Sequence, residues 1–281
     1  MSEKVILVTG ANSGMGKATA AKLADTGARV IMLCRDMARG EAALREVSEQ
    51  NSARKLELML CDLGDMRDIR RFTDEFKERY GRLDILVNNA GVITLDRRET
   101  KDGFELQFGV NHLGHFLLTL RLIDIMPEHS GARIVVVGSG AHKAGRIHFN
   151  DINLKKDYNV VSAYGQAKLA NLLFTRELAK RLDGKGITVN CAHPGAVATS
   201  MGVDRKTGFG KTITGLLKPL FQTPELGSRT ALYLALDPAV RDITGEYFYK
   251  CKRAKSSKAS KNEELARELF ELSEKLTDEH I

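Results

Sequence analysis

The chain alternates short apolar runs with helical patterns from one end to the other. Runs with few polar positions predict strands at residues 5–8, 30–34, 56–60, 85–87, 134–137 and 187–189, with helical segments such as 14–26 and 38–50 between them. Strands that are apolar along their whole length are covered on both faces, as in a parallel sheet between two layers of helices. The sequence has no Pro/Ser-rich linker and no internal repeat. We therefore expect a single doubly wound, Rossmann-type α/β domain.

Two segments stand outside this alternation. Apolar positions 209, 213, 216, 217 and 220 fit one face of a short helix, so we interpret residues 200–223 as a lid over a substrate site within a domain spanning 1–250. The apolar face indicates either a hydrophobic substrate or simple packing on the domain. Residues 251–281 are expected to form a basic segment and an amphipathic helix, with leucines at 265, 269, 272 and 276. That leucine stripe fits packing on its own domain or on a partner subunit.

Composition and charge narrow the function classes. The 281 residues are 43% hydrophobic and 28% charged, with a net charge of +7, but basic and acidic residues alternate over most of the chain, which argues against nucleic-acid binding. Only residues 250–261 form a basic cluster; we read it as a solvated tail, with a phosphate or weak membrane-surface contact as the alternative. Four cysteines without a C-x-x-C pair favour buried thiols in a reducing compartment. Without a signal peptide or an apolar run of membrane-spanning length, a cytoplasmic location is expected.

A glycine-rich loop follows the first predicted strand. Residues 9–16 read T-G-A-N-S-G-M-G and open the first helix. Glycines here allow a tight turn and let backbone N–H groups approach a pyrophosphate at the helix N-terminus. The spacing is G-x-x-x-G-x-G, and a plain glycine-rich turn is the alternative. The strand-loop-helix context favours a dinucleotide site.

The end of the second predicted strand indicates which dinucleotide is bound. An acidic residue there usually binds the ribose 2′-hydroxyl of NAD, whereas a basic residue accommodates the 2′-phosphate of NADP. This chain has Cys34 and Arg35, with Lys17 and Arg39 nearby. Because a guanidinium recognises phosphate through a planar fork, we expect NADP(H) to be preferred over NAD(H). Asp36 leaves an alternative, in which it binds Arg35 as an ion pair.

Tyr164 and Lys168 are the candidate catalytic pair. Residues four apart on a helix share a face, so the ammonium can lie beside the phenol. A phenol with a pKa of about 10 exchanges protons poorly at neutral pH, and a nearby cation favours the phenolate. Ser139, between two glycines after a predicted strand, is the candidate third member. Taken singly, the serine would more often be a turn residue and the tyrosine a packing residue.

Together these features resemble the short-chain dehydrogenase/reductase family over residues 4–250. The matching positions occur in the family's order: the 9–16 loop, Asp62-Leu63, Asn88–Gly91, Asn111, Ser139, Tyr164 with Lys168, and residues 194–199. The motifs C-R-D at 34–36, N-H-L-G-H-F at 111–116 and G-E-Y-F at 245–248 are similar to the retinol-dehydrogenase-like branch, which includes WW-domain-containing oxidoreductases. The resemblance implies a parallel sheet of about seven strands and, from its frequency in the family, a homo-oligomer.

The resemblance also implies residue roles. Tyr164 would exchange the proton with the alcohol or carbonyl oxygen, Ser139 would hydrogen-bond that oxygen, and Lys168 would stabilise the phenolate and bind the nicotinamide ribose. Asn111 would hold a water leading to Lys168. Asp62 would lie near the adenine, and Thr199 on the carboxamide. Tyr164 and Lys168 are joined in cofactor binding by Gly10, Asn12, Ser13, Gly14, Met15, Gly16, Arg35, Asp62, Leu63, Asn88, Ala90, Gly91, Pro194, Gly195, Val197 and Thr199.

The sequence therefore predicts an NADP(H)-dependent oxidoreductase that interconverts a carbonyl and an alcohol. The substrate is expected to be small and apolar, such as a retinoid, a long-chain aldehyde or a steroid-like ketone. The rival reading is a catalytically silent NADP(H)-sensing regulator, which the intact catalytic set disfavours. His112 and His115 are three apart but lack a third ligand at suitable spacing, so we expect no metal. His142 and His193 mark the branch and receive no chemical role.

Overall fold

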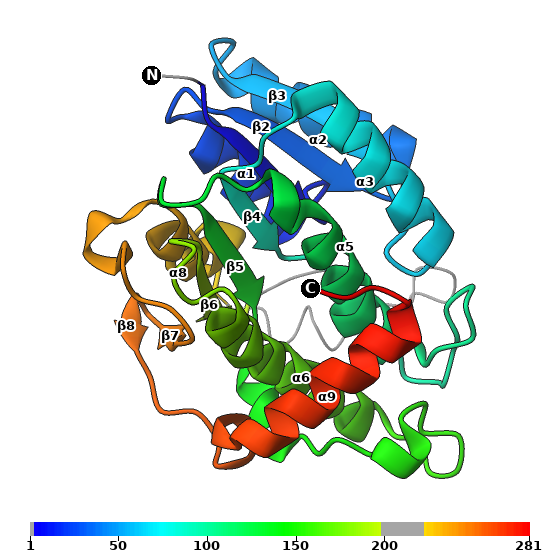
Figure 1. Cartoon of the computed structure of the whole chain (residues 1–281). Helices are drawn as coiled ribbons and strands as arrows, with labels where there is room; N and C mark the ends of the chain where they lie inside the picture. The colour runs from blue at the N-terminus through cyan, green and yellow to red at the C-terminus, as the bar shows by residue number, and fades with distance from the viewer. Residues whose placement is uncertain (1–2, 198–221) are drawn as a thin grey trace.

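The computed structural model describes residues 3–197 and 222–281. Its central feature is an eight-stranded sheet in the order β3-β2-β1-β4-β5-β6-β7-β8 (Figure 1). The first seven strands are parallel, and β8 pairs antiparallel with β7. The strands are β1 (Val5–Thr9), β2 (Arg29–Cys34), β3 (Lys55–Leu60), β4 (Ile85–Asn88), β5 (Arg133–Val137), β6 (Thr188–His193), β7 (Tyr247–Tyr249) and β8 (Lys252–Arg253).

The expectation of about seven strands was one short, because of β8. This strand has only two residues, both exposed and basic, so no apolar run marks it in the sequence. The turn that leads into it is made by Lys250 and Cys251, with φ values of 51° and 58°. Two successive residues with positive φ form a tight turn between antiparallel strands. Basic side chains on β8 also keep this sheet edge from pairing with another chain.

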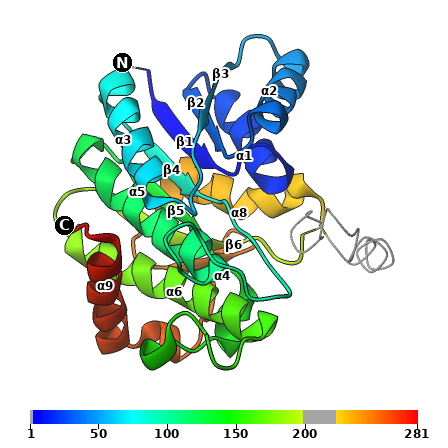
Figure 2. The same ribbon diagram turned by 90° about the vertical axis from the view of Figure 1, so that its right-hand side faces the viewer.

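Helices cover both faces of the sheet, as Figure 2 shows. Alternate strand residues point to opposite faces: Leu7 and Ile31 enter one core, whereas Ile6 and Val30 enter the other. The first core packs against α3 (Met66–Tyr80), α5 (Gly114–Leu122) and α6 (Val160–Arg181). The second core packs against α1 (Gly14–Ala24), α2 (Met37–Gln50) and α8 (Pro224–Leu236). This is the doubly wound arrangement expected from apolar strands.

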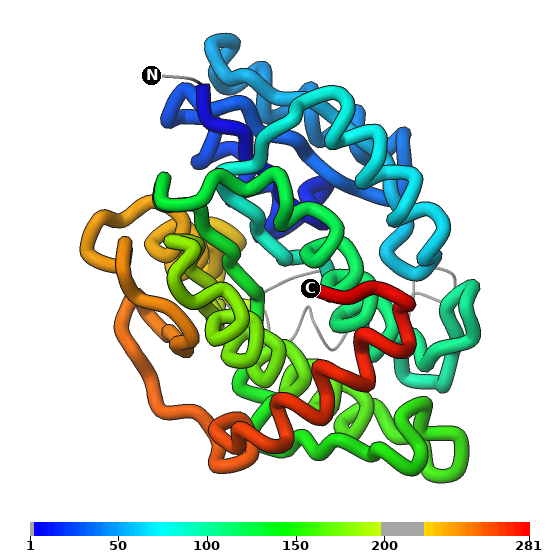
Figure 3. Tube along the Cα trace, viewed as in Figure 1, coloured from blue at the N-terminus to red at the C-terminus, as the bar shows by residue number. Residues whose placement is uncertain are grey.

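The C-terminal helix α9 (Glu263–Thr277) packs on its own domain along α6, as the chain trace in Figure 3 shows. Phe270 is buried, with its ring centroid 4.9 Å from that of Phe116. The Arg181 guanidinium lies 4.0 Å from the centre of the Phe270 ring and binds Glu274 at 3.2 Å. Burying one phenylalanine contributes about 1.5–3 kcal/mol. Of the leucine stripe, Leu269 is buried against α6, and Leu265 and Leu276 are partly buried in the same cluster.

Two sequence predictions concern a substrate lid and the absence of a membrane-spanning segment. Most of the proposed 200–223 lid lies outside the described residues, which resume at Gln222. Within the described residues, no helix has the length and apolar character needed to cross a lipid bilayer.

Between β4 and α5 the chain forms α4 (Leu106–Phe108) and a π-helical turn, Gly109–Leu113. π-Helical turns are rare in proteins, and those that occur are often found at functional sites.

Candidate active site

The glycine loop after β1 is shaped by close backbone contacts. Gly10 and Gly14 have φ values of 66° and 52°, which favour glycine. A Cβ on Gly16 would overlap the Gly10 carbonyl oxygen and the Asn89 side chain. Ser13 precedes α1 in an extended conformation and does not cap the helix with its side chain. The loop therefore brings the positive N-terminus of α1 to the carboxyl edge of the sheet, where an anion can bind.

Thr9 joins the ends of β1 and β4. Its Oγ1 accepts hydrogen bonds from the backbone N–H groups of Asn89 (2.9 Å) and Ala90 (2.8 Å). The Asn89 side chain donates back to the Thr9 carbonyl at 2.8 Å. Asn88 donates to Thr119 Oγ1 at 2.8 Å, while its buried Oδ1 has no partner among the described residues. A buried acceptor without a partner is costly, so a bound group that donates to Asn88 would fit here.

Arg35 follows β2 on the same edge. Its side chain is 68% exposed, and Nη1 lies 4.0 Å from Asp62 Oδ1, the outer limit of an ion pair. Asp36 instead caps α2, accepting from the Arg39 backbone N–H at 3.0 Å. The alternative pairing of Asp36 with Arg35 is therefore not the one adopted. Cys34 is buried against Gly40, where burial raises the pKa of its thiol.

The segment after β6 closes the cofactor side of the site. Gly195 has a φ of 85°, which favours glycine. Val197 forms a parallel bridge with Gln222, and a Cβ on Gly227 would strike both Val197 and Met15. Val197 and Met15 therefore both lie beside Gly227, which brings the end of this segment near the start of α1. Thr199 lies outside the described residues, and Leu63 is buried against Gly114.

Tyr164 and Lys168 lie on the first turns of α6. The helix begins after Asn159, whose side chain accepts from the Ser162 backbone N–H at 2.8 Å. Lys168 Nζ lies 5.7 Å from the centre of the Tyr164 ring and donates to the Val137 carbonyl at 2.9 Å. The Lys168 side chain is buried, so its charge is poorly screened by water. The ammonium thus lies between the tyrosine ring and the end of β5.

Ser139 comes directly after β5 and begins a short 3-10 helix over Gly140–Ala144. Its Oγ accepts from the Ala141 backbone N–H at 3.2 Å. A Cβ on Gly145 would overlap the Gly165 carbonyl oxygen, and one on Gly165 would lie 3.1 Å from Gly145 Cα. These two glycines let the segment after Ser139 approach α6 at the turn that carries Tyr164. Small residues at this crossing therefore bring the predicted serine, tyrosine and lysine together.

Asn111 occupies the π-helical turn before α5. Its side chain holds the turn after β4, accepting from the Val92 N–H at 2.7 Å and donating to the Val92 carbonyl at 3.0 Å. Its backbone carbonyl lies 3.2 Å from His115 Nδ1, and His115 Nε2 lies 2.9 Å from Thr9 Oγ1. His115 therefore joins the glycine loop to the catalytic side of the site.

The buried histidines form hydrogen bonds within the fold. Desolvation lowers the pKa of His112 to about 3 and that of His115 to about 4, so both rings are neutral at neutral pH. His112 Nε2 lies 2.9 Å from Ser273 Oγ of α9. Among residues 3–197 and 222–281, no three His, Cys, Asp or Glu side chains gather as a metal site would require.

A family model for short chain dehydrogenases matches residues 4–208 of this sequence. The chain belongs to the short-chain dehydrogenase family. The match spans more than half of the chain and includes the glycine loop, Ser139, Tyr164 and Lys168. Membership of the family thus agrees with the geometry at the carboxyl edge of the sheet, where ligands bind in open α/β folds.

The relatives of this short-chain dehydrogenase agree with the narrower resemblance. It is 44% identical to human retinol dehydrogenase 14, covering 98% of this chain and 86% of that protein. It is 42% identical to human retinol dehydrogenase 11, covering 96% and 84%. The chain therefore falls in the retinol-dehydrogenase-like branch.

Solved structures agree on the fold. A putative uncharacterized protein from Mycobacterium paratuberculosis superposes with a TM-score of 0.80 at 35% identity, covering 99% of this chain and 95% of that one. A short chain dehydrogenase from Burkholderia cenocepacia J2315, solved in complex with NADP, superposes at 0.69 with 26% identity, covering 87% and 95%. A blue fluorescent protein from a metagenomic library, solved with NADPH, gives 0.67 at 27% identity, covering 87% and 95%.

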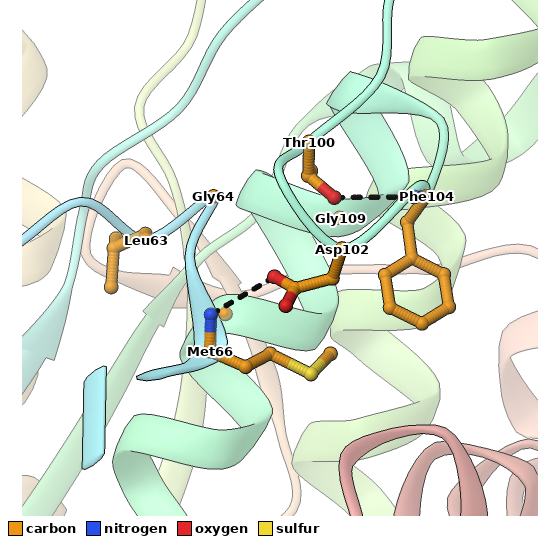
Figure 4. Close-up of a pocket in the computed structure, with 8 residues that line it drawn as sticks. Leu63, Gly64, Met66, Thr100, Asp102, Phe104 and Gly109 are labelled. Atoms are coloured by element: carbon orange, nitrogen blue, oxygen red, sulfur yellow. Dashed lines mark hydrogen bonds between the residues drawn. The ribbon is translucent and has the colours of Figure 1, made fainter. Parts of the chain in front are cut away.

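A small pocket lies apart from the predicted catalytic residues. Figure 4 shows it between the loop before α3 and residues 100–109, with Asp102 accepting from the Met66 backbone N–H at 2.9 Å. Thr100 Oγ1 accepts a hydrogen bond from the Phe104 backbone N–H at 3.1 Å. These contacts cap α3 and shape a loop. The pocket is too small for a dinucleotide, so we assign it a structural role.

Sequence reasoning left three contributors out of the site. Thr9, Asn89 and His115 carry the hydrogen bonds that join β1, β4 and the π-helical turn. Thr9 and Asn89 stand within the motifs that marked the nucleotide site, so their positions were a usable signal. His115 was noted only within the 111–116 motif and as a rejected metal ligand, because its contact with Thr9 spans 106 residues of sequence.

Proposed function

We propose that this short-chain dehydrogenase interconverts a carbonyl and an alcohol with NADP(H). The observation that carries the proposal is the position of Lys168, whose ammonium contacts the end of β5 beside Ser139 and lies 5.7 Å from the Tyr164 ring centre. A buried cation beside a phenol stabilises the phenolate, which is the form needed to accept a proton from an alcohol. This arrangement supports a proton-transfer role for Tyr164.

The residues divide the work of carbonyl reduction as follows. Ser139 Oγ donates a hydrogen bond to the substrate oxygen and stabilises the negative charge that develops on it. Tyr164 gives its phenolic proton to that oxygen, and takes it back when an alcohol is oxidised. Lys168 holds its charge near the phenolate throughout. The nicotinamide supplies or accepts the hydride when bound.

The chain's own residues fit a dinucleotide. The glycine loop presents the N-terminus of α1, where a pyrophosphate binds in such folds, and Asn88 Oδ1 is a buried acceptor without a partner in the described structure. Arg35 projects from the end of β2 with an exposed guanidinium. Because Asp36 is engaged as a helix cap, Arg35 is available for the 2′-phosphate of NADP(H).

For the substrate we propose an apolar carbonyl or alcohol, with a retinoid as the first candidate. The relatives named as retinol dehydrogenases support this choice. Leu95, in the loop after β4, and Val161, in the first turn of α6, also leave large apolar side chains exposed on the segments that lead to Asn111 and Tyr164. Apolar positions around a site suit an apolar ligand.

The direct test follows the loss of NADPH absorbance with retinal, long-chain aldehydes and steroid ketones, comparing the native chain with Tyr164→Phe. We expect turnover by the native protein, its loss by at least about a thousandfold in the variant, and unchanged NADPH binding. The variant keeps the ring and removes only the hydroxyl. Tight NADPH binding without turnover in either direction, across the whole panel, would instead favour the regulatory reading.

A further inference from the structure

His142 is a buried side chain that the chemistry above does not use. It lies in the 3-10 helix that begins at Ser139 and is fully shielded from solvent. Its Nδ1 lies 2.6 Å from the Ser139 carbonyl oxygen, and its Nε2 accepts from the backbone N–H of Ser257 at 3.2 Å. One ring thus contacts both the candidate catalytic serine and the segment that follows β8.

These two contacts fix the state of the ring. The Ser257 N–H can only donate, so His142 Nε2 must carry a lone pair. The Ser139 carbonyl can only accept, so Nδ1 must carry the proton. The ring is therefore neutral with the proton on Nδ1. Desolvation lowers the pKa of His142, in agreement with a neutral ring.

The segment around Ser257, whose N–H donates to His142, makes further hydrogen bonds to the domain. Ser257 lies in the basic segment, yet Arg176 of α6 donates to the neighbouring Ser256 Oγ at 3.2 Å. Ser260 is buried and donates from its hydroxyl to the Ser257 carbonyl at 2.8 Å. The His142 ring also meets the Tyr247 ring edge-on, with centroids 5.0 Å apart. The segment after β8 is thus a fixed part of the domain beneath Ser139.

We propose that His142 is a positioning residue for Ser139, held in a single tautomer by Ser257; the proposal rests on the function proposed above. The Ser139 carbonyl sets the plane of the peptide that links Ser139 to Gly140. The backbone N–H of His142 also donates to this carbonyl, but at 3.3 Å, so the ring N–H at 2.6 Å is the shorter of the two contacts that hold the plane. The same peptide leads to Ala141, whose N–H binds Ser139 Oγ. Holding the carbonyl therefore aims the hydroxyl at the substrate oxygen.

Three substitutions of His142 test the roles of its two ring nitrogens separately. His142→Phe keeps the ring and its packing on Tyr247 but removes both nitrogens. His142→Asn places an amide where Nδ1 lies and can still donate to Ser139. His142→Gln places the amide where Nε2 lies, keeping an acceptor for Ser257 but losing the donor to Ser139.

The kinetic test measures kcat and both KM values for the native chain and these variants. We expect kcat to fall about tenfold in His142→Phe and His142→Gln, the equivalent of one hydrogen bond, and to stay within about threefold in His142→Asn. The KM for NADPH should not change. An Asn variant that loses as much kcat as the Phe variant, at equal thermal stability, would overturn the proposal. So would an unchanged kcat in the Phe variant.

A second readout needs no substrate. Long-range proton–nitrogen NMR of histidine-labelled protein, assigned by the signal missing from His142→Phe, reports which ring nitrogen carries the proton. We expect the proton on Nδ1, and a proton on Nε2 would overturn the proposal. If the native chain turned over no carbonyl, the proposed function would fail while this NMR result still decided the contact between His142 and Ser139.

Discussion

The nucleotide end and the catalytic end of this site lie on the same edge of the sheet but are built differently. At the nucleotide end, backbone groups of β1 and β4 contact each other through Thr9 and Asn89, and the glycines leave no space for an added atom. At the catalytic end, Ser139 follows β5 whereas Tyr164 and Lys168 lie on α6, and a lysine hydrogen bond and one glycine crossing join the two segments. Binding should therefore be intolerant of added atoms, and catalysis sensitive to lost hydrogen bonds.

The largest effect on cofactor binding is expected at the nucleotide end, from Gly16→Ala. The added Cβ would overlap the Gly10 carbonyl and the Asn89 side chain, so the loop must shift away from the pyrophosphate. Overpacking of this kind costs about 1–3 kcal/mol, and we expect the Kd for NADPH to rise about a hundredfold. Isothermal titration measures it. Gly184→Ala is the control for loss of stability alone: its φ of 79° strains an alanine, but its Cβ would meet no atom within 4 Å, so its Kd should be native.

Arg35→Ala should have the next largest effect and should separate the two cofactors. Losing a charge-assisted contact to the 2′-phosphate should raise the Kd for NADPH about thirtyfold and leave that for NADH unchanged. Arg45→Ala, an exposed arginine on α2, is the matched control. Equal weakening of both nucleotides would mean that Arg35 does not select the cofactor.

Gly165→Ala should act at the catalytic end and spare binding. Its Cβ would lie 3.1 Å from Gly145 Cα, close enough to push the Ser139 segment from α6 by a few tenths of an ångström. We expect kcat to fall about tenfold while the Kd for NADPH stays native, because positioning errors act on the chemical step. The split between kcat and Kd, measured beside Gly184→Ala, decides the point. If Gly165→Ala raised the Kd for NADPH and left kcat native, this glycine crossing would belong to the nucleotide end and not to the catalytic end.

The last prediction concerns stability and not binding or turnover, and it rests on His115, which joins the two ends. Burial lowers its folded-state pKa to about 4, below the unfolded value of about 6.5. As pH falls from about 6.5 to about 4, the unfolded chain takes up a proton that the folded chain refuses, so stability present above pH 6.5 is progressively lost. The expected slope is at most about 1.4 kcal/mol per pH unit.

Urea unfolding of the native chain and of His115→Gln across this pH range measures the slope. The variant should show a shallower pH dependence, whereas His280→Gln, at an exposed position, should match the native chain. An identical slope in His115→Gln would show that His115 does not titrate with folding. His112, buried under α9, should add a further contribution of the same sign.

Sequence and structure agree where the signal is local. The apolar runs and the 9–16 loop are contiguous in sequence, so six strands, the layers and the glycine loop could be predicted from them, whereas β7 was expected only from the strand number that the family resemblance implies. The antiparallel strand β8 could not, because Lys252 and Arg253 have no apolar pattern. The leucine stripe predicted a helix face but not its partner, since that depends on Phe116, Phe174 and Arg181, all distant in sequence. Likewise, nothing near His142 in the sequence indicates Ser257.

The central claim is that the protein transfers a hydride from NADPH to a carbonyl carbon and that Tyr164 gives the proton to the carbonyl oxygen. The most direct measurement uses NADPH carrying deuterium on the transferring carbon, with retinal or another aldehyde that the native chain accepts, and mass spectrometry of the alcohol. We predict one deuterium on the carbinol carbon of the product, and no labelled product from Tyr164→Phe at matched protein and nucleotide occupancy. Alcohol without deuterium, or equal labelling by the variant, would contradict the account.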